Sequence, residues 1–163
     1  KEATEGYSSI KGFFKQYELI YIVGDERDLI RVRTNYRKDP PEEVYLYRLA
    51  GSIENAKRVF LGYLQTINEL RDRPKFYNTL TANCTNVIWM HSRLNPDHLP
   101  FSWKILLSGF TPAYLYEQGR LDLNLSFEAL QTRSRINKPA LQAAQAPDFS
   151  RRIREGLSLP ASQ

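Results

Sequence analysis

The stretch YELIYIVGDERDLIRVRTNYRKDPPEEVYLYRL (17–49) decides the predicted fold of this chain. Its first part, YELIYIV (17–23), is rich in β-branched and aromatic residues and ends at a Gly-Asp turn. Residues 29–36 alternate between two faces, one largely apolar and the other bearing arginines. After a break at Asp39-Pro40-Pro41, VYLYRL (44–49) is a third candidate strand. Three strands joined by short turns predict an antiparallel sheet.

Downstream of this stretch, the spacing of apolar residues changes from two to three or four, which is typical of a helix. The apolar stripe consists of Ile53, Ala56, Phe60, Tyr63, Leu64, Ile67 and Leu70. Ser52 is a suitable N-cap and Pro74 lies just beyond the last turn, so we predict a helix over 52–70. Shorter helices are expected at 85–93, 103–107, 112–118, 126–133 and 148–155. The predicted fold class is α+β, a permuted papain-like arrangement with the N-terminal sheet packed against helices and short C-terminal helices after it.

Composition limits the classes of protein to which the chain can belong. With 163 residues, 42% hydrophobic and 25% charged, it has the profile of one globular domain. Its longest wholly apolar run, 19–23, is far too short to cross a bilayer. A single cysteine excludes an internal disulfide and a cysteine-rich zinc site, and we expect neither a metal nor a cofactor. The net charge of +5 fits an anionic partner, and it equally fits an ordinary basic surface.

Cys84 is the first candidate for chemistry. It follows Asn83 where the polar segment 76–83 is expected to enter a helix, and the unpaired N–H groups of a first helical turn favour a thiolate. The alternative is a small buried hydrophobic residue, the usual role of a lone cysteine. Of the two histidines, His91 shares the face of Cys84 but lies about 10 Å further along the helix, beyond hydrogen-bond reach. His98 could fold back, but nothing in its spacing requires it.

Arginines form the second candidate site. Arg31, Arg33 and Arg37 fall on one face of the predicted strand, where guanidinium groups could bind a phosphate or a carboxylate. The alternative is a solvated sheet face that pairs with the acidic residues of 25–28. No phosphate-binding glycine loop occurs, and most aromatic residues occupy core positions. Because the basic residues fall in separated clusters, a nucleic-acid partner is not expected.

Six blocks of sequence resemble the Lnb N-terminal periplasmic domain family of bacteria, most members of which have no assigned reaction. The blocks are GYSSIKGFFKQYELIYIV (6–23), DERDLIRVRTNYR (25–37), VYLYRL (44–49), FYNTLTANCT (76–85), LPFSWKILLSGF (99–110) and YLYEQGRLD (114–122). They occur in order and run through nearly the whole chain. The family is named for a membrane enzyme that moves an acyl chain from the glyceryl group to the amino terminus of a lipoprotein.

The resemblance implies a role for the Asn-Cys-Thr segment. It is similar to the nucleophile segment of permuted papain-like enzymes, the relatives of NlpC peptidases and lecithin:retinol acyltransferase. By this resemblance Cys84 is the nucleophile, with Asn83 and Thr85 in support and Tyr77 and Asn78 lining the pocket. A second threonine common after the cysteine is replaced here by an asparagine, which keeps a polar first turn. In the family pattern the base histidine comes from a strand that would precede Lys1.

These features together predict a thiol-dependent acyltransferase or hydrolase of the bacterial envelope. We expect one domain over 1–158 that lacks its upstream part, a frayed tail over 159–163, and no activity without the missing base. Its partners would be a lipid, a lipoprotein or another acyl-bearing molecule, with a periplasmic location and a membrane-anchored parent protein. The alternative is a non-catalytic envelope module that binds an anionic ligand or a protein, in which Cys84 is buried and unreactive.

Overall fold

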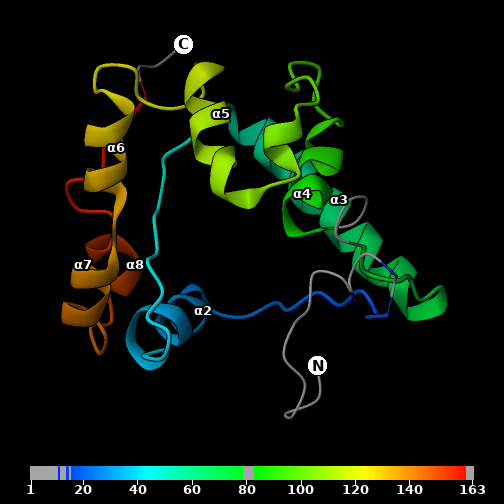
Figure 1. Ribbon diagram of the computed structural model, residues 1–163, viewed down its shortest axis with the longest axis horizontal. Coiled ribbons are helices and arrows are strands. Elements are labelled where there is room, and N and C mark those ends of the chain that lie inside the picture. Colours follow the sequence, from blue (N-terminus) through cyan, green and yellow to red (C-terminus); the bar gives the residue numbers. More distant parts are fainter. Residues whose placement is uncertain (1–10, 12–13, 15, 79–82, 161–163) are drawn as a thin grey trace. The chain divides into compact units, whose positions relative to one another are not determined.

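The computed structural model of the chain describes residues 11, 14, 16–78 and 83–160 (Figure 1). Its helices are α2 (Glu26–Arg31), the π-helix η1 (Val32–Tyr36), α3 (Ile53–Asp72), α4 (Cys84–Ser92), the 3-10 turns η2 (Trp103–Ile105) and η3 (Ser108–Phe110), α5 (Thr111–Glu117), α6 (Phe127–Ser134), α7 (Asn137–Gln142) and α8 (Phe149–Arg152). The chain divides into two compact units. The first comprises Lys1–Tyr21 and Gly51–Tyr114, and the second comprises Ile22–Ala50 and Leu115–Gln163.

The predicted antiparallel sheet is wrong. Within the described residues the structure is helical, and the β-pairing given for them consists of isolated bridges. Antiparallel bridges join Glu18 to Phe76, Lys38 to Pro41 and Tyr45 to Arg135. The three candidate strands do not pair with one another, so an α+β fold with a permuted papain-like sheet is not supported here.

The middle candidate strand, 29–36, folds instead as the end of α2 and the whole of η1. Asp25 caps α2 by accepting a hydrogen bond from the Arg27 backbone N–H at 2.9 Å, and the acidic side chains of its first turn suit the positive end of the helix dipole. Ile30 packs against the hydrophobic core, and the Thr34 hydroxyl donates to the Ile30 carbonyl at 3.1 Å. Residues four apart share a face in a strand and in a helix alike, so the alternation did not distinguish the two.

The other two candidate strands are extended but make only isolated pairings. In the first unit, the Leu19 N–H donates to the Lys75 carbonyl and the Tyr77 N–H to the Tyr17 carbonyl, both at 2.8 Å. In the second unit, residues 44–46 pair with 134–136, the connection between α6 and α7. β-Branched and aromatic residues fit an extended backbone packed on a neighbour, and a single bridge satisfies that preference as well as a sheet does.

Most of the predicted helices are confirmed, because local capping signals mark their starts. Ser52 begins α3 by accepting from the Asn55 N–H at 3.1 Å, and Ser126 begins α6 by accepting from the Ala129 N–H at 3.3 Å. The expected helices at 103–107 and 148–155 are shorter than predicted. Helix α7 is not among the predicted helices. It contains Pro139, which lies in the first turn of α7, where no backbone N–H is needed.

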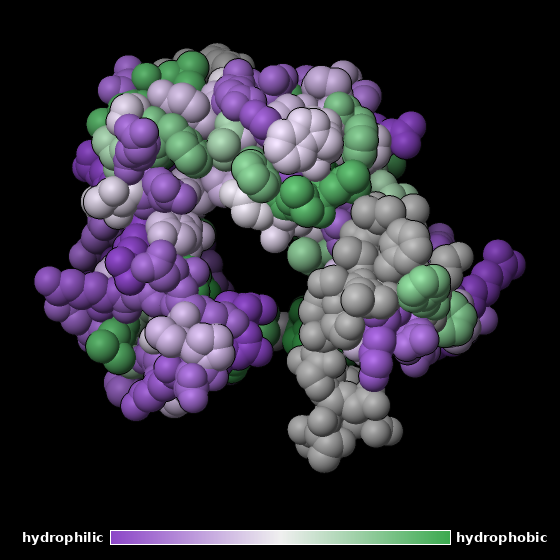
Figure 2. Space-filling view, in the orientation of Figure 1, coloured by the Kyte–Doolittle hydropathy of each residue, from purple (hydrophilic) through white to green (hydrophobic). Residues whose placement is uncertain are grey.

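The hydrophobic core of the second unit lies around α7 and α8. Its buried members are Ile136, Ala140, Ala143, Phe149 and Ile153, with Ile30, Val44, Leu46, Ala146 and Leu157 packed against them. The first unit differs, because many of its large apolar side chains remain exposed. Figure 2 shows such side chains, in green, at the surface where α4 and α5 are labelled in Figure 1.

Some predictions fall on parts of the chain that the structure does not describe. Residues 79–82 of the expected loop and residues 161–163 of the expected tail lie outside the described residues. The single domain over 1–158 stays a prediction. None of the helices in the described ranges combines the length and the apolar composition needed to cross a bilayer.

Candidate functional site

The amino terminus of α4 is fixed by a reciprocal pair of asparagines. The Asn83 side-chain oxygen accepts from the backbone N–H groups of Thr85 at 2.9 Å and Asn86 at 2.8 Å. In return, the Asn86 side-chain oxygen accepts from the Asn83 N–H at 2.9 Å. This is a capping box, which satisfies donors that a helix end otherwise leaves unpaired. The sequence Asn-Cys-Thr-Asn therefore starts the helix at a defined residue, and that residue is Cys84.

Cys84 presents its thiol at the surface from the first position of α4. Its side chain is exposed, whereas Asn83, Thr85 and Asn86 around it are buried. The Cys84 Sγ lies 3.7 Å from the Thr85 Oγ1, a distance that allows only a weak hydrogen bond to sulfur. Three buried polar residues thus flank the residue whose sulfur is exposed. The alternative hypothesis predicts a buried cysteine, and this exposure disagrees with it.

The capping box also decides which N–H groups remain available at this helix end. The N–H groups of Thr85 and Asn86 already donate to Asn83, so they are engaged. The N–H of Cys84 has no acceptor within the helix, because the first turn has no preceding turn of carbonyls. The Cys84 N–H is therefore better placed than those of Thr85 and Asn86 to donate to an oxyanion.

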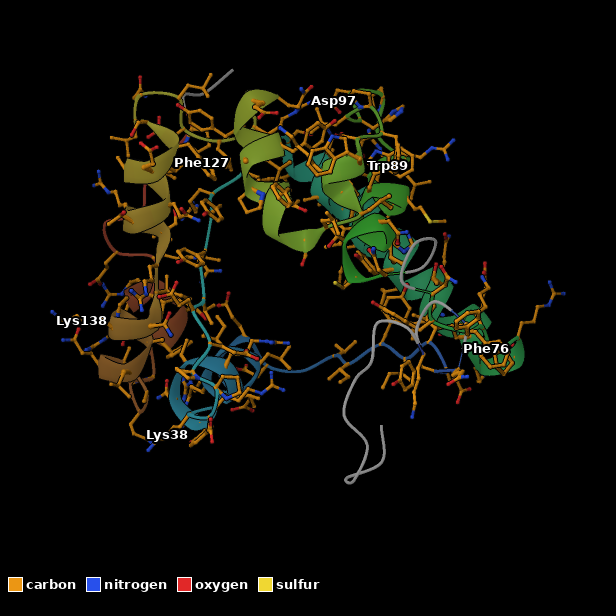
Figure 3. The ribbon with its side chains drawn as sticks, in the orientation of Figure 1. Lys38, Phe76, Trp89, Asp97, Phe127 and Lys138 are labelled. Atoms are coloured by element: carbon orange, nitrogen blue, oxygen red, sulfur yellow. The ribbon has the colours of Figure 1, made fainter. Side chains whose placement is uncertain are left out.

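A second contact ties this site to the turn that follows α4. The Asn83 side-chain amide donates to the Leu106 carbonyl at 3.1 Å, just after η2. The Trp89 indole N–H donates to the Leu99 carbonyl at 2.9 Å, and Trp89 packs edge-on against Phe101 with 5.2 Å between ring centroids. Figure 3 labels Trp89 on α4. The segment 99–106 is therefore held along α4 by two side chains, Asn83 at the start of the helix and Trp89 near its end.

Tyr63 lies where α3 packs on α4. Its ring centroid is 4.2 Å from that of His91 and 5.8 Å from that of Tyr21. Burial, followed by the nearby Tyr21 and Cys84, raises the pKa of Tyr63 to about 12. Its hydroxyl therefore stays protonated at neutral pH and can donate a hydrogen bond. Nothing in the sequence distinguished Tyr63 from the other members of the apolar stripe.

The histidines are both held within the first unit. His91 packs on Tyr63, its Nε2 is buried without a hydrogen-bond partner in the described residues, and burial lowers its pKa. Because α4 runs unbroken from Cys84 to Ser92, His91 lies about 10 Å further along the axis than Cys84. The His98 Nδ1 is 3.1 Å from the Asn95 carbonyl, in the turn after α4. His91 as a catalytic residue stays a prediction without geometric support.

The predicted pocket residues Tyr77 and Asn78 lie in the extended segment before α4. The Tyr77 backbone N–H donates to the Tyr17 carbonyl, and the Asn78 side chain is buried. Residues 79–82, which connect them to the cysteine segment, are outside the described part of the chain. Their place in a pocket stays a prediction.

The three arginines belong to the second unit, and they do not lie on a strand face as predicted. Arg33 in η1 and Arg37, the extended residue just after η1, both bind the Glu42 carboxylate, the former at 2.8 Å. Arg31 instead contacts Tyr36, donating to its hydroxyl and lying over its ring. The two guanidinium groups on Glu42 hold the pKa of that carboxyl below its usual value. Two of the three guanidinium groups are thus engaged by one carboxylate, which balances one of the three positive charges.

Glu42 is the ion-pair partner of Arg33 and Arg37, and the sequence analysis missed it. The acidic partners were expected at 25–28, but Asp25 caps α2 and Glu26 binds Arg154 at the far end of the chain. The turn that joins Lys38 to Pro41 brings Glu42 back toward η1. A proline pair followed by glutamates was the only signal in the sequence. Across the described ranges, no group of three or more His, Cys, Asp or Glu side chains could hold a metal ion.

Comparison with known proteins gives one result. The family model described as Lnb N-terminal periplasmic domain matches residues 1–109. No curated protein and no solved structure matches the chain. The matched part is well over half of the 163 residues, and it contains both α3 and the capped cysteine of α4. The chain therefore belongs to the Lnb N-terminal periplasmic domain family and is a periplasmic domain.

Proposed function

We propose that this domain carries out thiol-dependent acyl transfer or hydrolysis in the bacterial envelope, with Cys84 as the nucleophile. The single observation that carries the proposal is the exposed Cys84 thiol at the first residue of a capped helix. A thiolate at this position would lie at the positive end of the helix dipole. The substrates would be lipids, lipoproteins or other acyl-bearing molecules of the envelope.

The chemistry would proceed in two steps, acylation of the Cys84 thiol and transfer of the acyl group from it. The Cys84 thiolate attacks the carbonyl carbon of an ester or amide, forming a C–S bond while the C–O or C–N bond to the leaving group breaks. The leaving group takes up the proton that the base removed from the thiol. Water or an amine then attacks the thioester, and the C–S bond breaks to return the thiol. The Cys84 N–H would stabilise the oxyanion in both steps.

The described residues do not identify the base. His91 lies about 10 Å further along α4 than Cys84, and the His98 Nδ1 contacts the Asn95 carbonyl in the turn after α4. By the family resemblance, the base would be a histidine on a segment other than α4. Asn83 would then act as a positioning residue, because it fixes the helix end that carries the thiol. Thr85, whose hydroxyl lies beside the sulfur, would support the same geometry.

Alkylation of the single thiol tests the proposal directly. We expect iodoacetamide to modify native Cys84 at pH 7 several-fold faster than the same thiol in urea-denatured protein. Addition of imidazole, which can replace a missing base, should accelerate acyl transfer from a p-nitrophenyl ester to the wild-type chain. The Cys84→Ser variant gives the background rate of imidazole alone. A native thiol that reacts no faster than the denatured one, with no thioester mass in imidazole, would refute the proposal and favour a non-catalytic binding module.

A further inference from the structure

The aromatic cluster where α3 packs on α4 contains a tyrosine that the proposed chemistry does not yet use. Tyr63 contacts His91 on α4 with 4.2 Å between ring centroids, and Tyr21 meets it edge-on at 5.8 Å. The preceding residue, Gly62, lets the two helices approach closely, because a Cβ there would lie 3.0 Å from the His91 Nδ1 and 2.7 Å from the Leu94 Cδ1. The position of the Tyr63 ring against α4 is therefore fixed by contacts on both sides.

Tyr63 covers the face of α4 that also carries Cys84. His91 comes seven residues after Cys84, about 20° short of two full turns, so the two side chains leave the helix on the same face. The Tyr63 ring packs on His91 and therefore lies over this face. Tyr63 is also close enough to the Cys84 thiolate for the two groups to interact electrostatically. Packing and charge thus both place Tyr63 beside the region of the sulfur.

The protonation state of Tyr63 makes its hydroxyl a hydrogen-bond donor. Because the pKa of Tyr63 is raised to about 12, the hydroxyl keeps its hydrogen throughout the pH range in which a thiol ionises. That hydrogen rotates about the C–O bond, so it turns toward a negative charge that forms nearby. Elsewhere in the described ranges, the Tyr114 and Tyr116 hydroxyls donate to backbone carbonyls, whereas that of Tyr63 is not engaged in this way. A donor near a thiolate favours the ionised form and lowers the pKa of the thiol.

We propose that the Tyr63 hydroxyl stabilises the Cys84 thiolate and so sets the fraction of the thiol that is ionised at neutral pH. This role rests on the proposed function, because the thiolate that Tyr63 stabilises is the proposed nucleophile. The hydroxyl would act together with the dipole of α4, which favours a thiolate at the start of the helix. No proton leaves Tyr63, so the base that takes the thiol proton is a separate group. His91 would hold the Tyr63 ring in place by packing.

The pH dependence of Cys84 alkylation by iodoacetamide in the full chain tests this role. Tyr63→Phe removes the hydroxyl and keeps the ring that packs on His91 and Tyr21. We expect this variant to raise the pKa of the thiol, so that the alkylation rate at pH 7 falls by about threefold or more. At about pH 10.5, where the thiol is ionised in both proteins, the two rates should agree within about twofold. A change in access to the sulfur would instead lower both rates equally.

Tyr21→Phe is the matched control. It removes a hydroxyl from the same aromatic cluster, but burial raises the pKa of Tyr21 without a contribution from Cys84, so its alkylation profile should follow that of the wild type. In the reciprocal measurement, loss of the thiolate in Cys84→Ala should move the tyrosinate absorbance step of Tyr63 to lower pH.

The outcomes separate this role from the proposed acyl chemistry. A wild-type profile in Tyr63→Phe, equal shifts in both tyrosine variants, or a Tyr63 step that Cys84→Ala leaves in place would each overturn the inference, even if the p-nitrophenyl ester acylates Cys84. A profile that shifts in Tyr63→Phe and not in Tyr21→Phe, with no thioester formed, would support the role of Tyr63 and refute only the acyl chemistry.

Discussion

Replacing Asn83 with alanine should destabilise the first unit more than the loss of an ordinary helix cap does. The substitution removes the acceptor for the N–H groups of Thr85 and Asn86, which costs about 1–2 kcal/mol at a buried cap. It also removes the donor to the Leu106 carbonyl, worth about 1 kcal/mol. We therefore expect the free energy of unfolding to fall by about 2–3 kcal/mol. Urea denaturation followed by far-ultraviolet circular dichroism measures this change.

Ser52→Ala is the matched control in the same unit. Ser52 caps α3 through one exposed hydrogen bond to the Asn55 N–H, so its loss should cost about 1 kcal/mol or less. Asn83→Asp keeps the acceptor and removes the donor to Leu106, so its stability should lie between that of the wild type and that of Asn83→Ala. If Asn83→Ala costs no more than Ser52→Ala, the buried capping box does not hold the cysteine in place. The proposed positioning role of Asn83 would then be wrong.

Four further predictions concern packing and protonation. A Cβ at Gly62 would lie 2.7 Å from the Leu94 Cδ1 and 3.0 Å from the His91 Nδ1, so Gly62→Val should cost about 1–3 kcal/mol in urea unfolding, part of which Leu94→Ala restores. Burial lowers the pKa of His91, so the folded state favours the neutral ring, and stability should fall as the pH drops below about 6.5; His91→Gln should flatten that dependence in thermal melts. The raised pKa of Tyr63 should give a tyrosinate absorbance step near pH 12 that is absent from Tyr63→Phe, and the same shift means that stability is lost above about pH 10. Phe149→Ala should cost about 3–5 kcal/mol in the second unit, whereas alanine at the exposed Phe76 should cost far less.

The helix starts were predictable because their signals are local. Ser52, Asn83 and Ser126 each cap the helix that follows within three residues, so one sequence suffices to find them. Alternation over 29–36 misled because Ile30 and Thr34 share a face in either structure. The decisive residue was Asp25, whose cap starts α2 immediately before this segment. Weighing that cap against a short alternation would have favoured the helix.

The candidate site was predictable only where it is continuous in sequence. Asn83 and Cys84 are neighbours, and the sequence already placed a helix start between them. Tyr63 and Leu106 reach the same region from twenty or more residues away, through the packing of α3 on α4 and the turn at η2. No periodicity encodes which member of an apolar stripe faces a cysteine. Glu42 was missed for a related reason, since its pairing with Arg33 depends on the turn at Lys38–Pro41.

The capping box bears on the choice between an anion-binding module and a thiol enzyme. A helix end that binds an external anion must leave its N–H groups pointing at the ligand. Here Asn83 occupies the N–H groups of Thr85 and Asn86, and the one first-turn N–H without an acceptor inside the helix belongs to the residue that carries the thiol. The second proposed anion surface is also reduced, because Arg33 and Arg37 are bound to Glu42. Both features disfavour an anion-binding module, whereas the exposed Cys84 thiol supports the proposed thiol chemistry.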